Sequence, residues 1–260
     1  MNDKVIAVID GAVFDSINYG KVRVVNIVGS TVEIEFLNTG FSYTVSKGNL
    51  IKGLVKDYSL PNLYGVGCNT LGFMGKGYKD ALITKAYKKW QEMLKRCYNS
   101  KFLAGNTSYI GCTVVDEWKD FKNFMNWYAS KIIYEIQMSY ALDKDIICEG
   151  NKLYSPETCV LVPKEINNFI VKPRHTSVGK ELSIPHGVHL HKKTQRYQAY
   201  CNNPITGKRV SLKLFDTLEE AHFAHLQYKG EMAKYLVSKH GAYLEDSVIK
   251  KLQSMEVKCG

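Results

Sequence analysis

The stretch from Leu142 to Ile170 constrains the fold of this chain more than any other. Two short apolar runs, Leu142–Cys148 and Thr158–Val162, flank a loop rich in Gly, Asn, Ser and Pro, which is a pattern typical of two strands joined by a loop. Pro163 follows, and proline suits the first position of a helix because the N–H it lacks would have no intrahelical partner there. The sequence therefore predicts strand, loop, strand and helix in fewer than thirty residues.

Four residues of this stretch give it a resemblance to a known family, namely Asp143, Asn151, Cys159 and the helical Asn167. Their pattern resembles the variant HNH (His-Me finger) motif of phage-encoded homing endonucleases, and the resemblance extends from Trp90 to Asn168. It implies a ββα nuclease core that hydrolyses a phosphodiester bond of DNA with one divalent cation, Mg²⁺ being the usual one for oxygen ligands. It also implies that Asp143 and Asn167, or its neighbour Asn168, hold the metal.

The general base is where the sequence departs from that family. An Asp-His pair usually ends the first strand, whereas this chain reads Asp143-Lys144 and has no histidine before His175. Lys144 therefore occupies the position of the base, although lysine accepts a proton only when its pKa is strongly lowered. Asp145 or Glu149 are the alternatives for activating water.

Two further expectations concern the same loop. Strand alternation would place Asp143 and Asp145 on one face and Lys144 on the other. Asn151 would either orient the base or hold the hairpin. A finger that keeps its fold without cleaving DNA is the structural alternative, and the chain would then be a catalytically inactive, sequence-specific DNA-binding protein.

Residues 1–60 predict a small β module with a barrel-like arrangement. Short runs rich in β-branched and aromatic residues are separated by turn signals. These runs are Val5–Ile9, Val22–Ile27, Thr31–Phe36 and Phe41–Val45. Six basic and six acidic residues cancel in this module, so we expect an accessory role.

Residues 61–175 are expected to form the nuclease-like domain. Apolar residues recur at three- and four-residue steps over Ala81–Tyr98 and Asp116–Gln137, which predicts two helices whose aromatic stripes belong to a core. The HNH resemblance makes Arg96 the residue of this segment that faces a phosphate group. A surface arginine is the simpler alternative.

Residues 180–260 predict a second DNA-contacting domain. Three strand-like runs, His186–His191, Arg196–Asn202 and Lys208–Phe215, lead into a capping box at Thr217–Glu220 that begins a helix. The pattern resembles the ethylene-response-factor DNA-binding domain known from plants and from phage homing endonucleases. That resemblance implies a three-stranded sheet in the major groove, backed by the helix.

Alternation sorts the side chains of this sheet into an exposed face and a helix-facing face. On the third run, Val210, Leu212 and Leu214 are expected opposite the polar face. The candidates for contacting bases are Arg196, Gln198, Tyr200, Arg209, Ser211 and Lys213, and the candidates for contacting phosphates are Lys192, Lys193 and Lys208. A solvated polar surface is the alternative.

The whole chain therefore predicts an α+β protein with double-stranded DNA as its partner. Its net charge is +10, and the residues from 171 onward contribute 15 basic against 8 acidic side chains. No apolar run is long enough to span a bilayer and no signal peptide is recognisable, so we expect a cytoplasmic protein of an infected bacterial host. We expect a monomer without a small-molecule substrate.

A further alternative to a DNA endonuclease is a protein that binds RNA or a particular nucleic-acid structure, since basic aromatic sheets also bind single strands.

Overall fold

The computed structural model describes residues 7–72, 80–132, 139–170 and 184–255. The chain divides into two compact units, one formed by residues 1–110 and 114–126 and the other by residues 111–113 and 127–260. Seven α-helices and several small sheets in the described ranges confirm the mixed α+β class. None of these helices is both long and apolar enough to cross a membrane.

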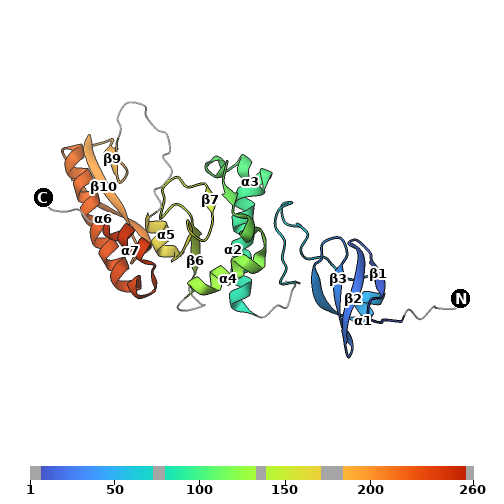
Figure 1. Cartoon of the computed structure of the whole chain (residues 1–260). Coiled ribbons are helices and arrows are strands. Elements are labelled where there is room, and N and C mark those ends of the chain that lie inside the picture. The colour runs from blue at the N-terminus through green and yellow to red at the C-terminus, as the bar shows by residue number, and fades with distance from the viewer. Residues whose placement is uncertain (1–6, 73–79, 133–138, 171–183, 256–260) are drawn as a thin grey trace. The chain divides into compact units, whose positions relative to one another are not determined.

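The N-terminal sheet is an antiparallel meander in the order β1-β2-β3-β4 (Figure 1). Its strands are β1 (Val13–Ser16), β2 (Gly20–Val28), β3 (Thr31–Phe36) and β4 (Ser42–Ser46). The expected strand Val5–Ile9 lies partly outside the described residues, and residues 7–9 are not in a strand. Residue burial alternates along β3, in step with the alternation of apolar and acidic residues in its sequence.

The barrel-like arrangement expected for this module is wrong. Strands β1 and β4 are the two edges of the sheet and do not pair with each other in the described residues. The chain instead turns from β4 into α1 (Lys47–Ile51), whose first turn is capped by the Ser46 side chain. Leu50 of this helix is fully buried in the core of the sheet, so a helix and not strand closure completes that core.

The helix α2 spans Ala81–Tyr98, as its periodicity predicted, and is capped by the Asp80 side chain. Trp90 of this helix is fully buried and donates its Nε1–H to the carbonyl of Trp118 at 2.7 Å. The short helices α3 (Ser100–Ala104) and η1 (Thr107–Tyr109) follow.

The expected helix Asp116–Gln137 is broken into η2 (Asp116–Lys119) and α4 (Phe121–Lys131), and residues 133–137 lie outside the described range. The break falls at Asp120, whose backbone is extended. Its carboxylate accepts the backbone N–H groups of Thr70 and Lys122, both at 3.1 Å, so a local side-chain bond replaces the helical continuation.

Two antiparallel strands and a helix follow in the second unit. Strand β6 (Tyr140–Asp143) pairs with β8 (Val160–Pro163), and α5 (Lys164–Ile170) begins directly after β8. We call residues 139–170 the finger. Its loop contains β7 (Leu153–Tyr154), and β5 (Thr113–Val114) precedes it in the chain. The first strand is shorter than predicted, and Pro163 ends a strand where it was expected to open the helix.

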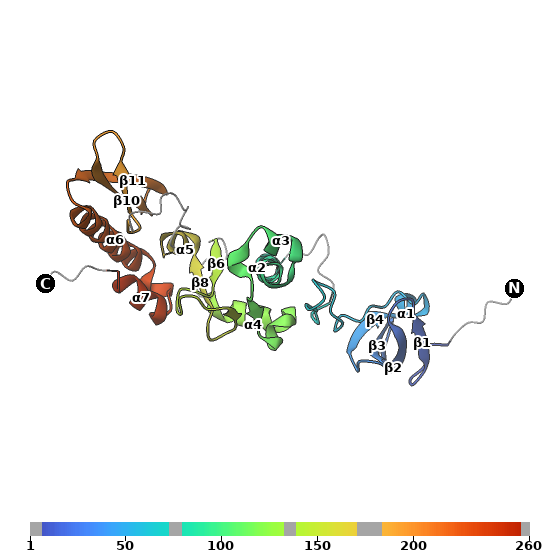
Figure 2. The same cartoon turned by 90° about the horizontal axis from the view of Figure 1, so that it is seen from above.

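The C-terminal sheet has the order β11-β10-β9 and is antiparallel throughout. Its strands are β9 (Val188–His191), β10 (Arg196–Asn203) and β11 (Lys208–Phe215), close to their predicted bounds. Helix α6 (Leu218–His240) begins with the predicted capping box and lies across one face of the sheet (Figures 1 and 2). The 3-10 turn η3 (Gly241–Tyr243) and α7 (Asp246–Gln253) end the described chain.

The finger and the C-terminal helices share one hydrophobic core. Finger residues Val162, Ile166 and Phe169 are buried together with Leu236 of α6 and Leu252 of α7. The finger therefore buries its apolar side against α6 and α7. The finger and the C-terminal sheet with its helices belong to one unit.

Candidate functional site

Asp143 ends strand β6 and fixes the turn that follows it. Its Oδ1 atom accepts the backbone N–H of Asp145 at 2.7 Å and that of Ile146 at 2.9 Å. Such bonds from an aspartate to the backbone ahead of it compete with strand pairing. This is why the chain bends after Asp143, and why the strand alternation expected to continue to Asp145 does not apply beyond that point.

Lys144 lies inside the finger loop, with only 5 % of its surface exposed. Its ammonium group donates to the Asp145 carboxylate at 2.8 and 2.9 Å and to the carbonyl of Asn151, and it lies 5.9 Å from the centre of the Tyr154 ring. A general base must offer a lone pair, whereas this nitrogen points its hydrogens at oxygen acceptors. The arrangement suits a structural cation that holds the loop.

Asn151 supplies the second half of the same network. Its amide Nδ2 donates to the carbonyls of Lys144 at 3.0 Å and Leu153 at 2.6 Å, and its Oδ1 accepts the Leu153 N–H at 3.0 Å. Thr158 also donates its hydroxyl hydrogen to the Leu153 carbonyl, at 2.7 Å. Of the two roles considered for Asn151, these bonds correspond to holding the hairpin.

Asn167 lies on α5 with an amide oxygen that is buried and has no hydrogen-bond partner among the described residues. An orphaned oxygen acceptor is uncommon in a folded protein and is satisfied by water or by a cation. Asn167 and Asp143 offer an amide and a carboxylate oxygen, which are the ligand types that Mg²⁺ prefers. In the described residues, no group of three or more His, Cys, Asp or Glu side chains could hold a metal ion.

The two cysteines of the finger do not form a thiolate pair. Cys159 is buried, which raises the pKa of its thiol to about 12, whereas Cys148 is exposed. A neutral, buried thiol packs as a small apolar group.

A carboxylate on the finger helix is bound by a lysine and a histidine of α6. Glu165 accepts from the Lys239 ammonium at 3.0 Å and from Nε2 of His240 at 2.8 Å. Burial raises the pKa of Glu165, but the bonds from His240 and Lys239 outweigh it and hold that pKa below its ordinary value. We call this trio the clamp. Sequence reasoning missed it, because its members are more than seventy residues apart.

The exposed face of the C-terminal sheet brings several predicted side chains together. The Arg209 guanidinium lies 3.3 Å from the centre of the Tyr200 ring, and His189 contacts the same ring at a centroid distance of 5.6 Å. Gln198 pairs with His189 across the strands. Burial, the nearby Arg209 and His191 hold the pKa of His189 below its ordinary value, which favours the neutral imidazole.

His225 of α6 supports Tyr200 from the other face of the sheet. Its Nδ1 lies 2.7 Å from the Tyr200 carbonyl oxygen. Gly187 packs against the same imidazole with a φ of +92°, and a Cβ atom there would lie 2.2 Å from His225 Nδ1. Only glycine fits this approach, so the sheet and its supporting helix are closely packed under Tyr200.

Arg196, predicted as a base reader, is already paired. Its Nε lies 2.7 Å from the Asp216 carboxylate and its Nη2 donates to the Leu214 carbonyl at 3.3 Å. The pair is largely exposed, so a nucleic acid would have to compete with Asp216 for this guanidinium. Asp216 was not among the predicted residues.

A register shift changes the face assignment near the end of β11. Tyr200 pairs with Ser211, but Gln198 pairs with Leu214, so one extra residue of β11 stands opposite Ala199. Leu214 therefore shares the face of its partner Gln198, and the expectation that it lies opposite the polar face is wrong. Lys213 is exposed and lies at the bulge, where strand alternation does not tell on which face of the sheet its side chain lies.

The remaining candidates are surface cations. Lys192 and Lys193 are exposed in the turn between β9 and β10, and Lys208 is exposed at the start of β11. Arg96 belongs to the other unit, where its guanidinium lies 5.7 Å from the centre of the Tyr109 ring.

No protein-family model, curated protein or solved structure matches this chain.

Proposed function

We propose that this chain binds double-stranded DNA through the exposed face of the sheet β11-β10-β9. The observation that supports this most is the contact of the Arg209 guanidinium with the Tyr200 ring, since a guanidinium held over a ring keeps its donors available to a ligand. Arg reads guanine and Gln reads adenine bidentately in the major groove, so Arg209 and Gln198 are the proposed base readers. Lys192, Lys193 and Lys208 at the margins of the sheet are the proposed phosphate contacts.

Selection from a pool of random-sequence duplexes tests this proposal. The wild-type chain should enrich a defined sequence, and its affinity should fall steeply as salt rises because phosphate contacts release counterions. Enrichment of no sequence, or binding that does not respond to salt, would contradict the proposal.

We propose, as the second part of this function, that the finger is the site of a metal-dependent DNA endonuclease of the homing type. The support is the order of two antiparallel strands and a helix, together with the oxygen atoms of Asp143 and Asn167. These two residues would hold Mg²⁺, which when bound would neutralise charge on the scissile phosphate. Lys144 and Asn151 would hold the loop. Asp145, whose half-exposed carboxylate is paired with Lys144, is the proposed acceptor of the proton from water.

Cleavage of the selected duplex in the presence of Mg²⁺ tests this second part. Asp143→Ala and Asn167→Ala should abolish cleavage while leaving duplex affinity within about twofold of the wild type. Asp145→Asn should lower the cleavage rate by about 100-fold or more, in the range typical for loss of a general base.

The engaged Lys144 ammonium favours a second candidate function, a DNA-binding protein that does not cleave. The position of the family's histidine base is here filled by a cation that already donates to oxygen acceptors. Tight, salt-sensitive binding by a wild-type chain that leaves the duplex intact with Mg²⁺ or Mn²⁺ would select this candidate over the endonuclease.

A further inference from the structure

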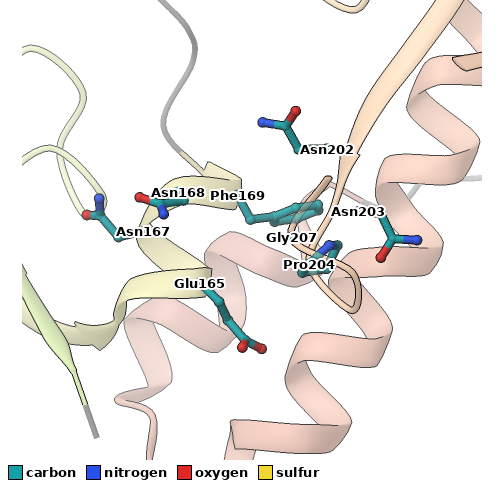
Figure 3. Close-up of a pocket in the computed structure, with 8 residues that line it drawn as sticks. All are labelled: Glu165, Asn167, Asn168, Phe169, Asn202, Asn203, Pro204 and Gly207. Atoms are coloured by element: carbon teal, nitrogen blue, oxygen red, sulfur yellow. The ribbon is translucent and has the colours of Figure 1, made fainter. Parts of the chain in front are cut away.

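A pocket of about 480 Å³ opens between the finger helix α5 and the turn that joins β10 to β11. Glu165, Asn167, Asn168 and Phe169 line it from α5, and Asn167 is also the candidate metal ligand. Asn202, Asn203 and Gly207 line it from the sheet, and Figure 3 shows these groups around the Phe169 side chain. Pockets of this size hold small organic groups in proteins.

The pocket suits an uncharged ligand. The carboxylate of Glu165 is already bound by Lys239 and His240 in the clamp. No lysine or arginine is among the described residues that line the pocket, so it offers no cation for a phosphate group. Its polar character comes mainly from side-chain amides.

Asn167, whose amide oxygen has no partner among the described residues, is assigned to the proposed metal site, and two other pocket amides make no hydrogen bond in the described part of the chain. Asn203 is engaged, because its Oδ1 accepts the Ile205 N–H at 2.8 Å and its Nδ2 donates to the Tyr228 hydroxyl at 2.8 Å. Asn168 and Asn202 are exposed, and no hydrogen bond between described residues uses their side chains. In the view of Figure 3 Asn202 lies above Phe169, and Asn168 lies to the left of Phe169.

The pocket continues the face that we propose for DNA binding. Asn202 is two residues beyond Tyr200 on β10 and pairs with Arg209 on β11. Alternation along a strand places Asn202 on the face that carries Tyr200. A nucleic acid lying on the sheet would therefore have its bases beside the mouth of the pocket.

We propose that this pocket receives one unpaired nucleobase of the bound DNA, with adenine preferred. The inference rests on the proposed DNA binding and adds to it a contact outside the sheet. An asparagine amide presents a donor and an acceptor that match the N6 and N7 atoms of adenine, and Phe169 offers an apolar wall for the base. Taking a base out of the stack costs free energy, and a base that is already unpaired avoids that cost.

Affinity for three short duplexes tests the proposal. The first is fully paired, the second has one unpaired adenine, and the third has one unpaired thymine at the same place, all in the selected sequence. The wild type should bind the duplex with unpaired adenine about tenfold or more tightly than the paired duplex, with the thymine duplex in between.

Variants distinguish binding of the unpaired base in the pocket from binding of the paired duplex by the sheet. Asn168→Ala combined with Asn202→Ala should remove the preference for the unpaired adenine. Asn168→Ala alone leaves the sheet unchanged, so it should weaken that preference and keep the affinity for the paired duplex within twofold. Gln253→Ala removes an exposed amide from α7 that does not line the pocket, and it should behave as the wild type.

Equal wild-type affinity for the three duplexes, or a preference that survives in the double variant, would overturn the pocket proposal while leaving DNA binding by the sheet intact. Failure to bind any of the three duplexes would instead overturn the proposed function, and the pocket proposal with it.

Discussion

At the scale of the residue, Lys144 shows how burial decides the role of an ionisable group. A lysine is stable inside a protein when its ammonium is paired and its hydrogens are accepted. Asp145 and the Asn151 carbonyl supply those acceptors, so Lys144, which the HNH resemblance places where a base is expected, is part of the scaffold of the loop.

We predict that Asn151→Ala destabilises the second unit by about 2–3 kcal/mol, because it leaves the Lys144 carbonyl and the Leu153 N–H without their partners. Urea unfolding followed by circular dichroism measures the change. Asn168→Ala is the matched control, since this exposed amide makes no hydrogen bond to another described residue, and its effect should stay within about 0.5 kcal/mol. Equal effects of the two variants would contradict the role assigned to Asn151.

The candidate metal residues could be anticipated only in part from the sequence. The resemblance pointed to Asp143 and Asn167, and Asn167 proves to have an orphaned amide oxygen. The engagement of Asp143 with the turn and of Lys144 with Asn151 could not be read from the chain, since both depend on how the loop folds back on itself.

At the scale of the element, the clamp joins the finger helix to α6. Its central carboxylate, Glu165, lies two residues before Asn167, so the clamp also fixes the helix that presents the candidate metal ligand.

We predict that the clamp loses its effect at acid pH. The pKa of Glu165 is lowered in the folded chain, so its contribution to stability is present above the unfolded pKa, about 4.3, and is lost as pH falls through the folded value. Glu165→Gln should therefore destabilise the unit by about 1 kcal/mol at pH 6 and by much less at pH 3. A stability difference that is the same at both pH values would contradict this account.

The shared core predicts that a change in α6 weakens the finger. Leu236 is fully buried beside Val162 and Ile166, so Leu236→Ala should cost about 2–4 kcal/mol through the cavity it leaves. Hydrogen exchange at the amides of β8 and α5 should speed up together with that of the C-terminal sheet. Unchanged exchange in the finger would show that it folds independently of α6.

Local patterns predicted some elements to the residue and others poorly. The bounds of α2 and β11 followed from strong periodicity and clear turn or capping signals. The bounds of β6 and α4 did not, because Asp143 and Asp120 bind neighbouring backbone N–H groups and so end or interrupt the element. The bulge in β11 depends on its pairing with β10 and has no signal within the strand itself.

At the scale of the whole molecule, charge is distributed unevenly along the chain. The residues from 171 onward hold 15 basic and 8 acidic side chains, whereas residues 1–60 are balanced. DNA affinity should therefore depend on the C-terminal sheet, and substitutions in the N-terminal sheet should change it little.

The affinity of the full chain for its selected duplex, measured for two arginine variants, tests the central claim most directly. Arg209→Ala removes a guanidinium from the C-terminal sheet, and Arg23→Ala makes the same change of charge at an exposed, Glu35-paired arginine of the N-terminal sheet. If the C-terminal sheet reads DNA, Arg209→Ala should weaken binding by about 1–3 kcal/mol, roughly 5- to 150-fold, while Arg23→Ala stays within twofold of the wild type. Equal losses in the two variants, or no loss in Arg209→Ala, would contradict the account.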